Sequence, residues 1–294
     1  MRDARGDLSP ADALAAQGLH VLANRYAVDG RVTWHAPAAR GFAPMNTYLV
    51  REGAHALLLD TGISLHTQEL LAALEPLLAP PCELAVLHTR IGEYTTISNT
   101  VPIAERFALA AVHSEQDDSP RWVDFRAGHG RDGGAPDALP EARIEIFAVP
   151  DTIAVDPGRT RVLEIFHATL RLLPTSWLYD ARTHTLFTSD LFSGVIRPGP
   201  EGPWILTAAQ DTTTLEQMRS HLLETRYWWL AGARVEPIRA AVAETFARLD
   251  VETIAPDYGC VLHGREVVDR HAAMLDEILA QAPLMTPPAM VGSG

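Results

Sequence analysis

The chain has 294 residues, of which 47% are hydrophobic and 21% charged, a balance typical of a folded globular protein and unlike that of a disordered chain. Its formal net charge of −13 disfavours a nucleic-acid partner, because surfaces that bind nucleic acid carry an excess of Lys and Arg. The length permits one large α/β domain or two small ones, so only motifs can decide between them.

Cysteine usage and hydropathy narrow the class further. Cys82 and Cys260 form no C-x-x-C pair, so the sequence indicates neither a disulfide framework nor a thiolate metal site. No apolar run reaches the roughly 18–20 residues that a membrane span needs, and the charged residues 1–10 are not followed by a signal-peptide core. We therefore expect a soluble cytoplasmic protein without a membrane partner.

The first part of the chain alternates strand and helix patterns. Residues 41–62 read GFAPMNTYLVREGAHALLLDTG and predict a hairpin that ends in a tight acidic turn at Asp60. Apolar residues at helical spacing predict helices over 67–78 and 101–107, and short apolar runs predict buried strands over 84–87 and 108–112. This alternation is typical of a layered α/β domain.

The second part begins with a segment rich in glycine, proline and aspartate. Residues 128–139 predict a loop, for which a lid over a site is one role. Further strands are predicted over 144–149, 161–166, 169–173, 177–179, 184–188 and 251–255, and helices over 215–230, 236–249 and 265–281. The proline- and glycine-rich tail from about 282 is expected to fray.

Four segments between Met45 and Gly259 resemble, in this order, the diiron domain of flavodiiron proteins in the metallo-β-lactamase superfamily. They are MNTYLV…LLLDTG, LHTRIGEYTTISN, LPTSWLYDARTHTLFTSDLFSG and EPIRAAVAETFARLDVETIAPDYG. The resemblance implies one metallo-β-lactamase-type αββα domain over 1–294, an α/β fold of two mixed β-sheets flanked by helices. The family's flavodoxin domain has no counterpart after Gly259, so the resemblance implies no bound flavin, and any electrons that the reaction needs would come from a separate electron-donor protein.

In that family, imidazoles and carboxylates hold two irons, and the first ligand loop reads His-x-Glu-x-Asp-His. The corresponding residues here are His88, Arg90, Gly92 and Glu93, so His88 alone is unchanged. Arg90 is a permanent cation without a lone pair and would repel iron from the position of the family's glutamate. The usual first metal site therefore cannot persist unaltered.

The remaining family ligands are also partly replaced. Leu172 stands where the family has a histidine before a tryptophan-proline pair, and Tyr258 in PDYG stands for the final histidine. Asp190 in SDLFSG matches the bridging aspartate. Two ligands of the usual set remain, His88 and Asp190.

Several nearby side chains offer compensation. Glu93 stands where a histidine ligand stood, Asp257 and Tyr258 offer oxygen, and His263 or His167 could supply nitrogen. A site rebuilt in this way would be richer in oxygen, which suits iron or manganese better than zinc.

Each candidate also has a structural interpretation. His88 could be a satisfied histidine at a strand end, and Glu93 could pair with Arg90 three residues earlier in the same loop, which is the metal-free alternative. Tyr258 could pack its ring against substrate and donate its hydroxyl. Asp60 resembles the superfamily's structural aspartate beneath the site, and the aromatic run 227–229 is expected in the core or at a dimer contact.

The resemblance favours a non-haem iron enzyme with about two irons per chain that uses dioxygen to oxidise or hydroxylate a small organic substrate. Asp190 would bridge the metals, with His88, Glu93 and His263 as further metal ligands. Arg90 would offer its charge to a substrate carboxylate or phosphate, beside Asp257 and Tyr258 in the catalytic cleft.

Two alternatives remain open. One is a metal-dependent hydrolase of an ester, thioester or lactone, although the H-x-H-x-D-H signature of those enzymes is missing. The other is a metal-free binding or sensing protein in which Arg90 and Glu93 form an ion pair. A homodimer is expected in either case.

Overall fold

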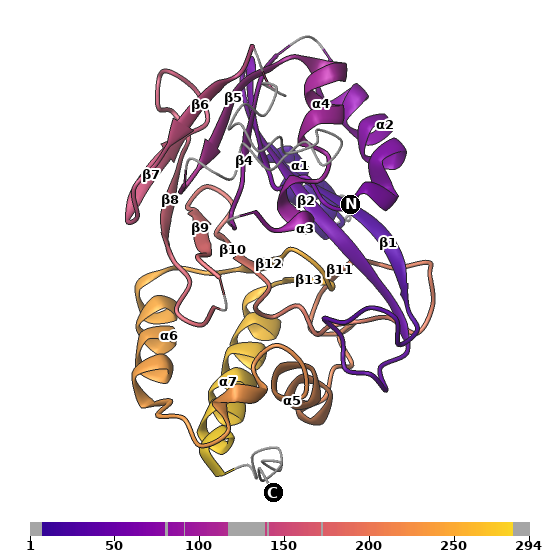
Figure 1. Cartoon of the computed structure of the whole chain (residues 1–294), viewed down its shortest axis with the longest axis vertical. Helices are drawn as coiled ribbons and strands as arrows, with labels where there is room; N and C mark the ends of the chain where they lie inside the picture. Colours follow the sequence, from indigo (N-terminus) through magenta and orange to yellow (C-terminus); the bar gives the residue numbers. More distant parts are fainter. Residues whose placement is uncertain are drawn as a thin grey trace, which may run out of the picture.

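The computed structural model describes residues 8–79, 82–90, 92–116, 139, 141–171 and 173–284. In this part of the chain, two β-sheets pack against each other, and helices cover their outer faces, as Figure 1 shows for α2 and α4 beside one sheet and for α6 and α7 beside the other. The predicted α/β class with two mixed sheets is confirmed.

The first sheet is formed by the N-terminal part of the chain. In spatial order its strands are β1 (Leu19–Val28), β2 (Gly41–Glu52), β3 (His55–Leu59), β4 (Glu83–Leu87), β5 (Leu109–Ser114) and β6 (Arg143–Ile146). The strands β1, β2 and β3 pair antiparallel, whereas β3 to β6 pair parallel. The predicted hairpin is the β2–β3 pair, whose turn includes Gly53 with a φ of 57° that glycine adopts without steric cost.

The second sheet is also mixed. In spatial order its strands are β11 (Ile205–Leu206), β13 (Val261–His263), β12 (Thr253–Pro256), β10 (Thr185–Ser189), β9 (Ser176–Asp180), β8 (Val162–His167) and β7 (Asp151–Ala154). The pair β10–β12 is parallel, so the carboxyl ends of these two strands lie at the same edge of the sheet.

Seven α-helices complete the described part. They are α1 (Pro10–Ala16), α2 (Thr67–Leu77), α3 (Tyr94–Ile97), α4 (Thr100–Phe107), α5 (Leu215–Leu223), α6 (Glu236–Arg248) and α7 (Arg265–Gln281). Helix α5 begins with a capping box, in which the Thr214 hydroxyl accepts from the Gln217 amide and the Gln217 side chain accepts from the Thr214 amide. Short 3-10 helices span Ser64–His66, Trp228–Leu230 and Ala282–Leu284.

The core has three layers. Leu59 of β3 and Ile165 of β8 belong to the buried apolar layer between the two sheets. Leu74 of α2 packs on the outer face of the first sheet, and Leu275 of α7 on the outer face of the second. Complete burial of each such side chain stabilises the fold by about 1.5–3 kcal/mol. Because this apolar packing holds the two sheets together, it also fixes where the loops at the sheet edges meet.

Some sequence predictions differ from the structure. The helix predicted over 215–230 is wrong, because α5 ends at Leu223 and a separate 3-10 helix forms at Trp228–Leu230. The described residues of 169–173 form no strand, and the strands β1 and β7 were not predicted. The burial of β1 follows no strict alternation, which explains the weak signal. Except for Leu139, the predicted lid over 128–139 lies outside the described residues, as does the tail beyond 284.

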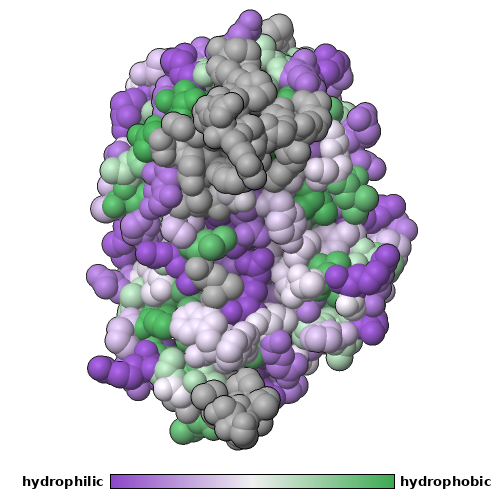
Figure 2. All heavy atoms as spheres, in the orientation of Figure 1, coloured by the Kyte–Doolittle hydropathy of each residue, from purple (hydrophilic) through white to green (hydrophobic). Residues whose placement is uncertain are grey.

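Hydrophilic and apolar residues are interspersed over the coloured part of the face in Figure 2. Among the described helices, none is long and apolar enough to cross a bilayer.

Candidate functional site

The loops after three strands carry most of the residues singled out in the sequence. Arg90 and Glu93 follow β4, Asp190 follows β10, and Asp257 and Tyr258 follow β12. Because β10 and β12 are parallel neighbours, their following loops start at the same edge of the second sheet, and a bridge between Arg90 and Thr175 ties the β4 loop to the start of β9. The structure thereby brings residues of both sheets into one site.

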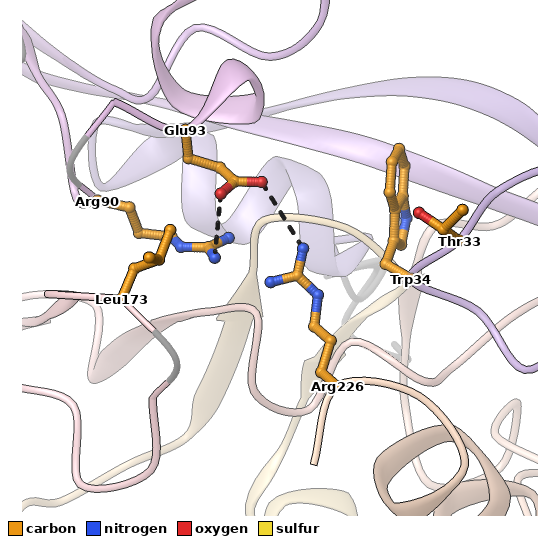
Figure 3. A pocket seen from close by; sticks show the side chains of 6 residues that line it. All are labelled: Thr33, Trp34, Arg90, Glu93, Leu173 and Arg226. Atoms are coloured by element: carbon orange, nitrogen blue, oxygen red, sulfur yellow. Dashed lines mark ion pairs between the residues drawn. The ribbon is translucent and has the colours of Figure 1, made fainter. Parts of the chain in front are cut away.

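Two arginines and two carboxylates form a cluster at this edge. The Arg90 Nη2 lies 3.5 Å from the Glu93 Oε2 and 3.7 Å from the Asp190 Oδ2. Arg226 Nη1 donates a hydrogen bond of 2.8 Å to the same Asp190 Oδ2, and its Nη2 lies 3.7 Å from the Glu93 Oε1. In Figure 3, Glu93 faces both guanidinium groups. The two positive and two negative charges of these side chains balance.

The guanidinium of Arg90 is incompletely satisfied. The residue is only 2% exposed, yet its Nε and Nη1 have no hydrogen-bond partner among the described residues. Its two carboxylate contacts, at 3.5 and 3.7 Å, are longer than ordinary hydrogen bonds. Unpaired donors of a buried charge are costly, and these two buried nitrogens are donors that the described residues leave unused.

A pair of aspartates lies beneath the cluster. The Thr89 amide and hydroxyl donate to the Asp60 carboxylate at 2.8 and 2.7 Å, which positions the residue just before Arg90. The Ser189 hydroxyl donates to the Asp257 Oδ2 at 2.9 Å. Burial raises the pKa of Asp257 to about 6, although the Arg90 charge lowers it, and burial together with the Asp257 carboxyl raises the pKa of Asp60.

An aromatic wall, formed by the rings of Trp34 and Tyr258, borders the cluster. The Arg226 guanidinium lies 5.8 Å from the centre of the Tyr258 ring, a cation–π contact, and the Trp34 ring centre lies 5.6 Å from that of Tyr258. Tyr258 is fully buried, and among the described residues its hydroxyl makes no hydrogen bond of ordinary geometry. Gly259, with a φ of 83°, lets this loop approach closely, because a Cβ there would lie 2.4 Å from the Ser193 carbonyl oxygen.

The cluster opens into a pocket of about 340 Å³, within the range of small-molecule sites. Its lining residues, drawn in Figure 3, are Thr33, Trp34, Arg90, Glu93, Leu173 and Arg226. They combine two cations and one anion with an indole and an aliphatic side chain. This mixture suits a small molecule with a charged end and an apolar body.

The other predicted site residues lie elsewhere or make other contacts. His88 is buried, its Nε2 shares a hydrogen bond of 3.0 Å with the Thr100 hydroxyl, and burial lowers its pKa to about 3, so the ring is neutral. His263 pairs with Thr253 at the start of β12, the opposite end from Asp257, and its Nδ1 shares a hydrogen bond with the Thr253 hydroxyl. The structure therefore does not bring His263 into the site.

Two further positions complete the predicted set. His167 Nε2 lies 2.9 Å from the Glu115 carboxylate on a partly exposed surface. Leu172, the counterpart of a lost family histidine, lies outside the described residues.

The donor set does not fit the paired irons that the resemblance implied. Glu93 and Asp190 both face guanidinium groups, and a divalent cation between these carboxylates would meet the positive charges of Arg90 and Arg226. Over the described ranges, no three His, Cys, Asp or Glu side chains converge closely enough to hold a metal ion. The expected iron, manganese or zinc centre therefore needs a rearrangement of both arginines.

Sequence reasoning missed two residues of the site. Arg226 directly precedes the aromatic run 227–229, and Trp34 lies in the connection between β1 and β2. No local pattern marks either residue, because each reaches the pocket from a segment distant in sequence from the β4 loop.

Comparisons with known proteins bear on the fold. The sequence matches no family model and no curated protein. Among solved structures, the chain is similar to rubredoxin oxygen:oxidoreductase from Desulfovibrio gigas, with 16% identity and a TM-score of 0.65, covering 90% of this chain and 60% of that one. The flavodiiron protein from Giardia intestinalis gives 13% identity and a TM-score of 0.65, covering 95% and 60%.

A shorter structure matches over nearly its whole length. A fragment of a diflavin flavoprotein from Nostoc shares 17% identity with a TM-score of 0.60, covering 90% of this chain and 93% of the fragment. The chain spans 60% of the length of each of the two longer proteins. The chain therefore has the fold of the metallo-β-lactamase-like diiron domain of flavodiiron proteins.

Proposed function

We propose that the chain is a metal-independent binding protein whose pocket holds a small organic anion, a carboxylate or a phosphate, against Arg90 and Arg226. The observation that carries the proposal is the pair of unpartnered nitrogens, Nε and Nη1, on the buried Arg90 guanidinium. Each of these nitrogens can donate to one oxygen of a carboxylate or a phosphate, and the permanent charge of the guanidinium favours an anion.

A second buried arginine supports this interpretation. Arg161, also 2% exposed, donates from Nε to Asp180 and from Nη1 to the carbonyls of Gln17 and Arg51, and its Nη2 contacts Asp180 as well. The same fold thus satisfies every nitrogen of a purely structural buried arginine. The free nitrogens of Arg90 mark a position that a ligand completes.

The rest of the pocket favours a ligand with an apolar body. Trp34 and Leu173 supply an indole and an aliphatic surface, and Arg226 keeps an accessible fraction of 16% of its side chain. Glu93 contacts both arginines and keeps them from repelling each other in the unliganded pocket. When an anion binds, its negative charge would take over part of the neutralisation of the two arginines that Glu93 provides.

The fold is shared with diiron oxidoreductase domains, so an iron-dependent oxidase or monooxygenase is the competing function. That activity, like the metal-dependent hydrolase, requires Glu93 and Asp190 to be released from their arginine partners. The ion-pair geometry supports the metal-free alternative instead.

Metal content separates these functions. Elemental analysis of the chain purified without added metal, repeated after anaerobic iron loading, is expected to find far less than one metal ion per chain. About two irons per chain, lost in Asp190→Ala, would overturn the proposal and establish the diiron alternative.

Ligand binding is tested by titration calorimetry with benzoate and phenyl phosphate, with benzyl alcohol as the uncharged control. We expect Arg90→Gln to weaken binding of the anions about tenfold or more. The matched control is Arg239→Gln, which removes a partly exposed arginine paired with Asp276 on the surface and should leave binding unchanged. Equal binding of benzyl alcohol and benzoate would contradict the proposal.

A further inference from the structure

A second cavity lies on the other side of the aromatic wall. It has a volume of about 530 Å³ and is bounded by the residues around 35–40, the segment 194–198 and one face of α5 with two of the threonines before it. Two buried histidines line it, His35 at 3% exposure and His221 at 8%. Their ring centres are 5.5 Å apart.

The hydrogen bonds of His35 define its tautomer. The Trp34 indole N–H donates to the Tyr26 hydroxyl at 3.0 Å, and that hydroxyl lies 2.8 Å from the His35 Nε2. The indole is a donor only, and the Tyr26 hydroxyl hydrogen has no other acceptor among the described residues. Tyr26 therefore donates to Nε2, which places the ring proton of a neutral His35 on Nδ1.

His221 carries its proton on the other nitrogen. The Ser193 hydroxyl donates to the Asp190 carbonyl oxygen at 2.6 Å, so its oxygen accepts from the His221 Nε2 at 3.1 Å. A Cβ on Gly194 would lie 2.8 Å from the His221 Cδ2 and 2.9 Å from its Cγ, so this side of the ring packs closely against the segment. With its proton on Nε2, a neutral His221 carries its lone pair on Nδ1, which is left as an acceptor.

Both rings are neutral in this environment. Burial lowers the pKa of His35 to about 3 and that of His221 to about 4, the second helped by the Arg226 charge. In the part of the chain that the structure describes, neither Nδ1 has a hydrogen-bond partner, and neither is sealed from solvent. The two rings on the cavity wall, whose centres are 5.5 Å apart, thus carry one N–H donor and one nitrogen acceptor.

We propose that this cavity is a second ligand site, which binds a neutral molecule through an amide-type edge, a C=O next to an N–H. The ligand C=O accepts from His35 Nδ1–H, and its N–H donates to His221 Nδ1. This pairing satisfies two unpaired polar atoms of the cavity wall at once, which gives it specificity over ligands that lack either group.

Two other ligand classes fit the same atoms less well. A metal ion needs lone pairs, and His35 Nδ1 carries a proton. Arg40 and Arg197 line the cavity, but the Nη1 of each donates to backbone carbonyls, and an anion would also face the lone pair of His221 and the Glu216 carboxylate. Neither alternative uses both histidine nitrogens.

The test is a nuclear magnetic resonance titration of the full chain labelled with ¹⁵N-histidine, in which two-bond correlations report the protonation of each ring nitrogen. The probe is 2-pyrrolidone, and the matched control is N-methyl-2-pyrrolidone, which lacks the N–H. We expect a saturable shift of His221 Nδ1 and His35 Nδ1 with 2-pyrrolidone, and an affinity at least about tenfold weaker for the methylated control.

Variants locate the binding. His221→Phe keeps a planar ring without the acceptor and should abolish the saturable shift at His35, whereas Glu216→Gln at the same cavity should retain it. Arg90→Gln should also retain it, which separates this site from the anion pocket.

Three results would overturn the proposal: no saturable shift at either histidine, equal affinity for both pyrrolidones, or a free protein whose His35 and His221 show the opposite tautomers. The comparison of the two pyrrolidones uses the unaltered protein, so the test holds even if His221→Phe does not fold.

Discussion

Arg161 and Arg90 are equally buried, at 2% exposure, but only Arg161 has a hydrogen-bond partner for every guanidinium nitrogen. Arg161 ties Asp180 of β9 to the backbone at Gln17 and Arg51, and thereby joins the two sheets. Arg90 instead lines a pocket, and two of its nitrogens have no hydrogen-bond partner in the part of the chain that the structure describes. Burial of an arginine therefore does not distinguish a structural role from a binding role, whereas the hydrogen bonds of its nitrogens do.

The largest loss of stability is expected from breaking the buried ion pair between Arg161 and Asp180. Asp180→Ala leaves the Arg161 charge buried without its carboxylate, and we expect a loss of about 3–5 kcal/mol in the free energy of unfolding. Asp190→Ala should cost less, about 1–3 kcal/mol, because Glu93 still faces both arginines and water enters from the pocket. Urea unfolding monitored by circular dichroism measures both values, and equal losses would contradict the comparison.

The stability of the fold is expected to depend on pH through Asp257, which interacts with the Arg90 charge. With a pKa of about 6 in the folded chain, against about 3.9 when unfolded, Asp257 binds more protons in the native state between these values. Its contribution to stability is therefore present below about pH 4 and lost as the pH rises through 6.

Asp257→Asn removes this titration and keeps an acceptor for the Ser189 hydroxyl. We expect the variant to be similar in stability to the wild type near pH 4 and about 1–3 kcal/mol more stable at pH 7. Unfolding curves across this range test the sign, and a gap that narrows with rising pH would show it to be wrong.

A smaller effect is expected from removing the free guanidinium itself. Arg90→Met deletes a buried charge with poor hydrogen bonding, while Asp190 keeps its 2.8 Å bond to Arg226, so stability should change by no more than about 1 kcal/mol or even rise. Arg161→Met should be clearly more harmful, because Asp180 and two backbone carbonyls lose their donor. Thermal denaturation of the two variants in one buffer compares their stabilities. Similar losses of stability would contradict the distinction between the two arginines.

The smallest effect is expected at the surface. Arg239 and Asp276 pair at 2.8 Å with side chains that are 36% and 50% exposed. Asp276→Ala should cost about 0–1 kcal/mol and become neutral in high salt, because water screens such pairs. A cost equal to that of Asp190→Ala would mean that the buried cluster is as solvated as the surface.

Much of the fold could be predicted from local pattern. The β2–β3 hairpin and the helix over 265–281 were predicted close to their observed bounds, because short apolar runs and helical periodicity are properties of neighbouring residues. The end of α5 and the strand β1 were not predicted. Their limits depend on packing against distant segments, which overrides local preference.

The residues of the candidate site likewise fall into those that the sequence predicted and those that it did not. Arg90 and Glu93 are three residues apart in one loop, so their ion pair was among the sequence's alternatives, and Asp190 was singled out from its motif. Arg226 and Trp34 were not found, and His263 was expected at a site that it does not reach. Sequence spacing specifies which charges one loop carries. Only the packing of two sheets against their helices decides which loops meet, because that packing is driven by apolar burial spread over the whole chain.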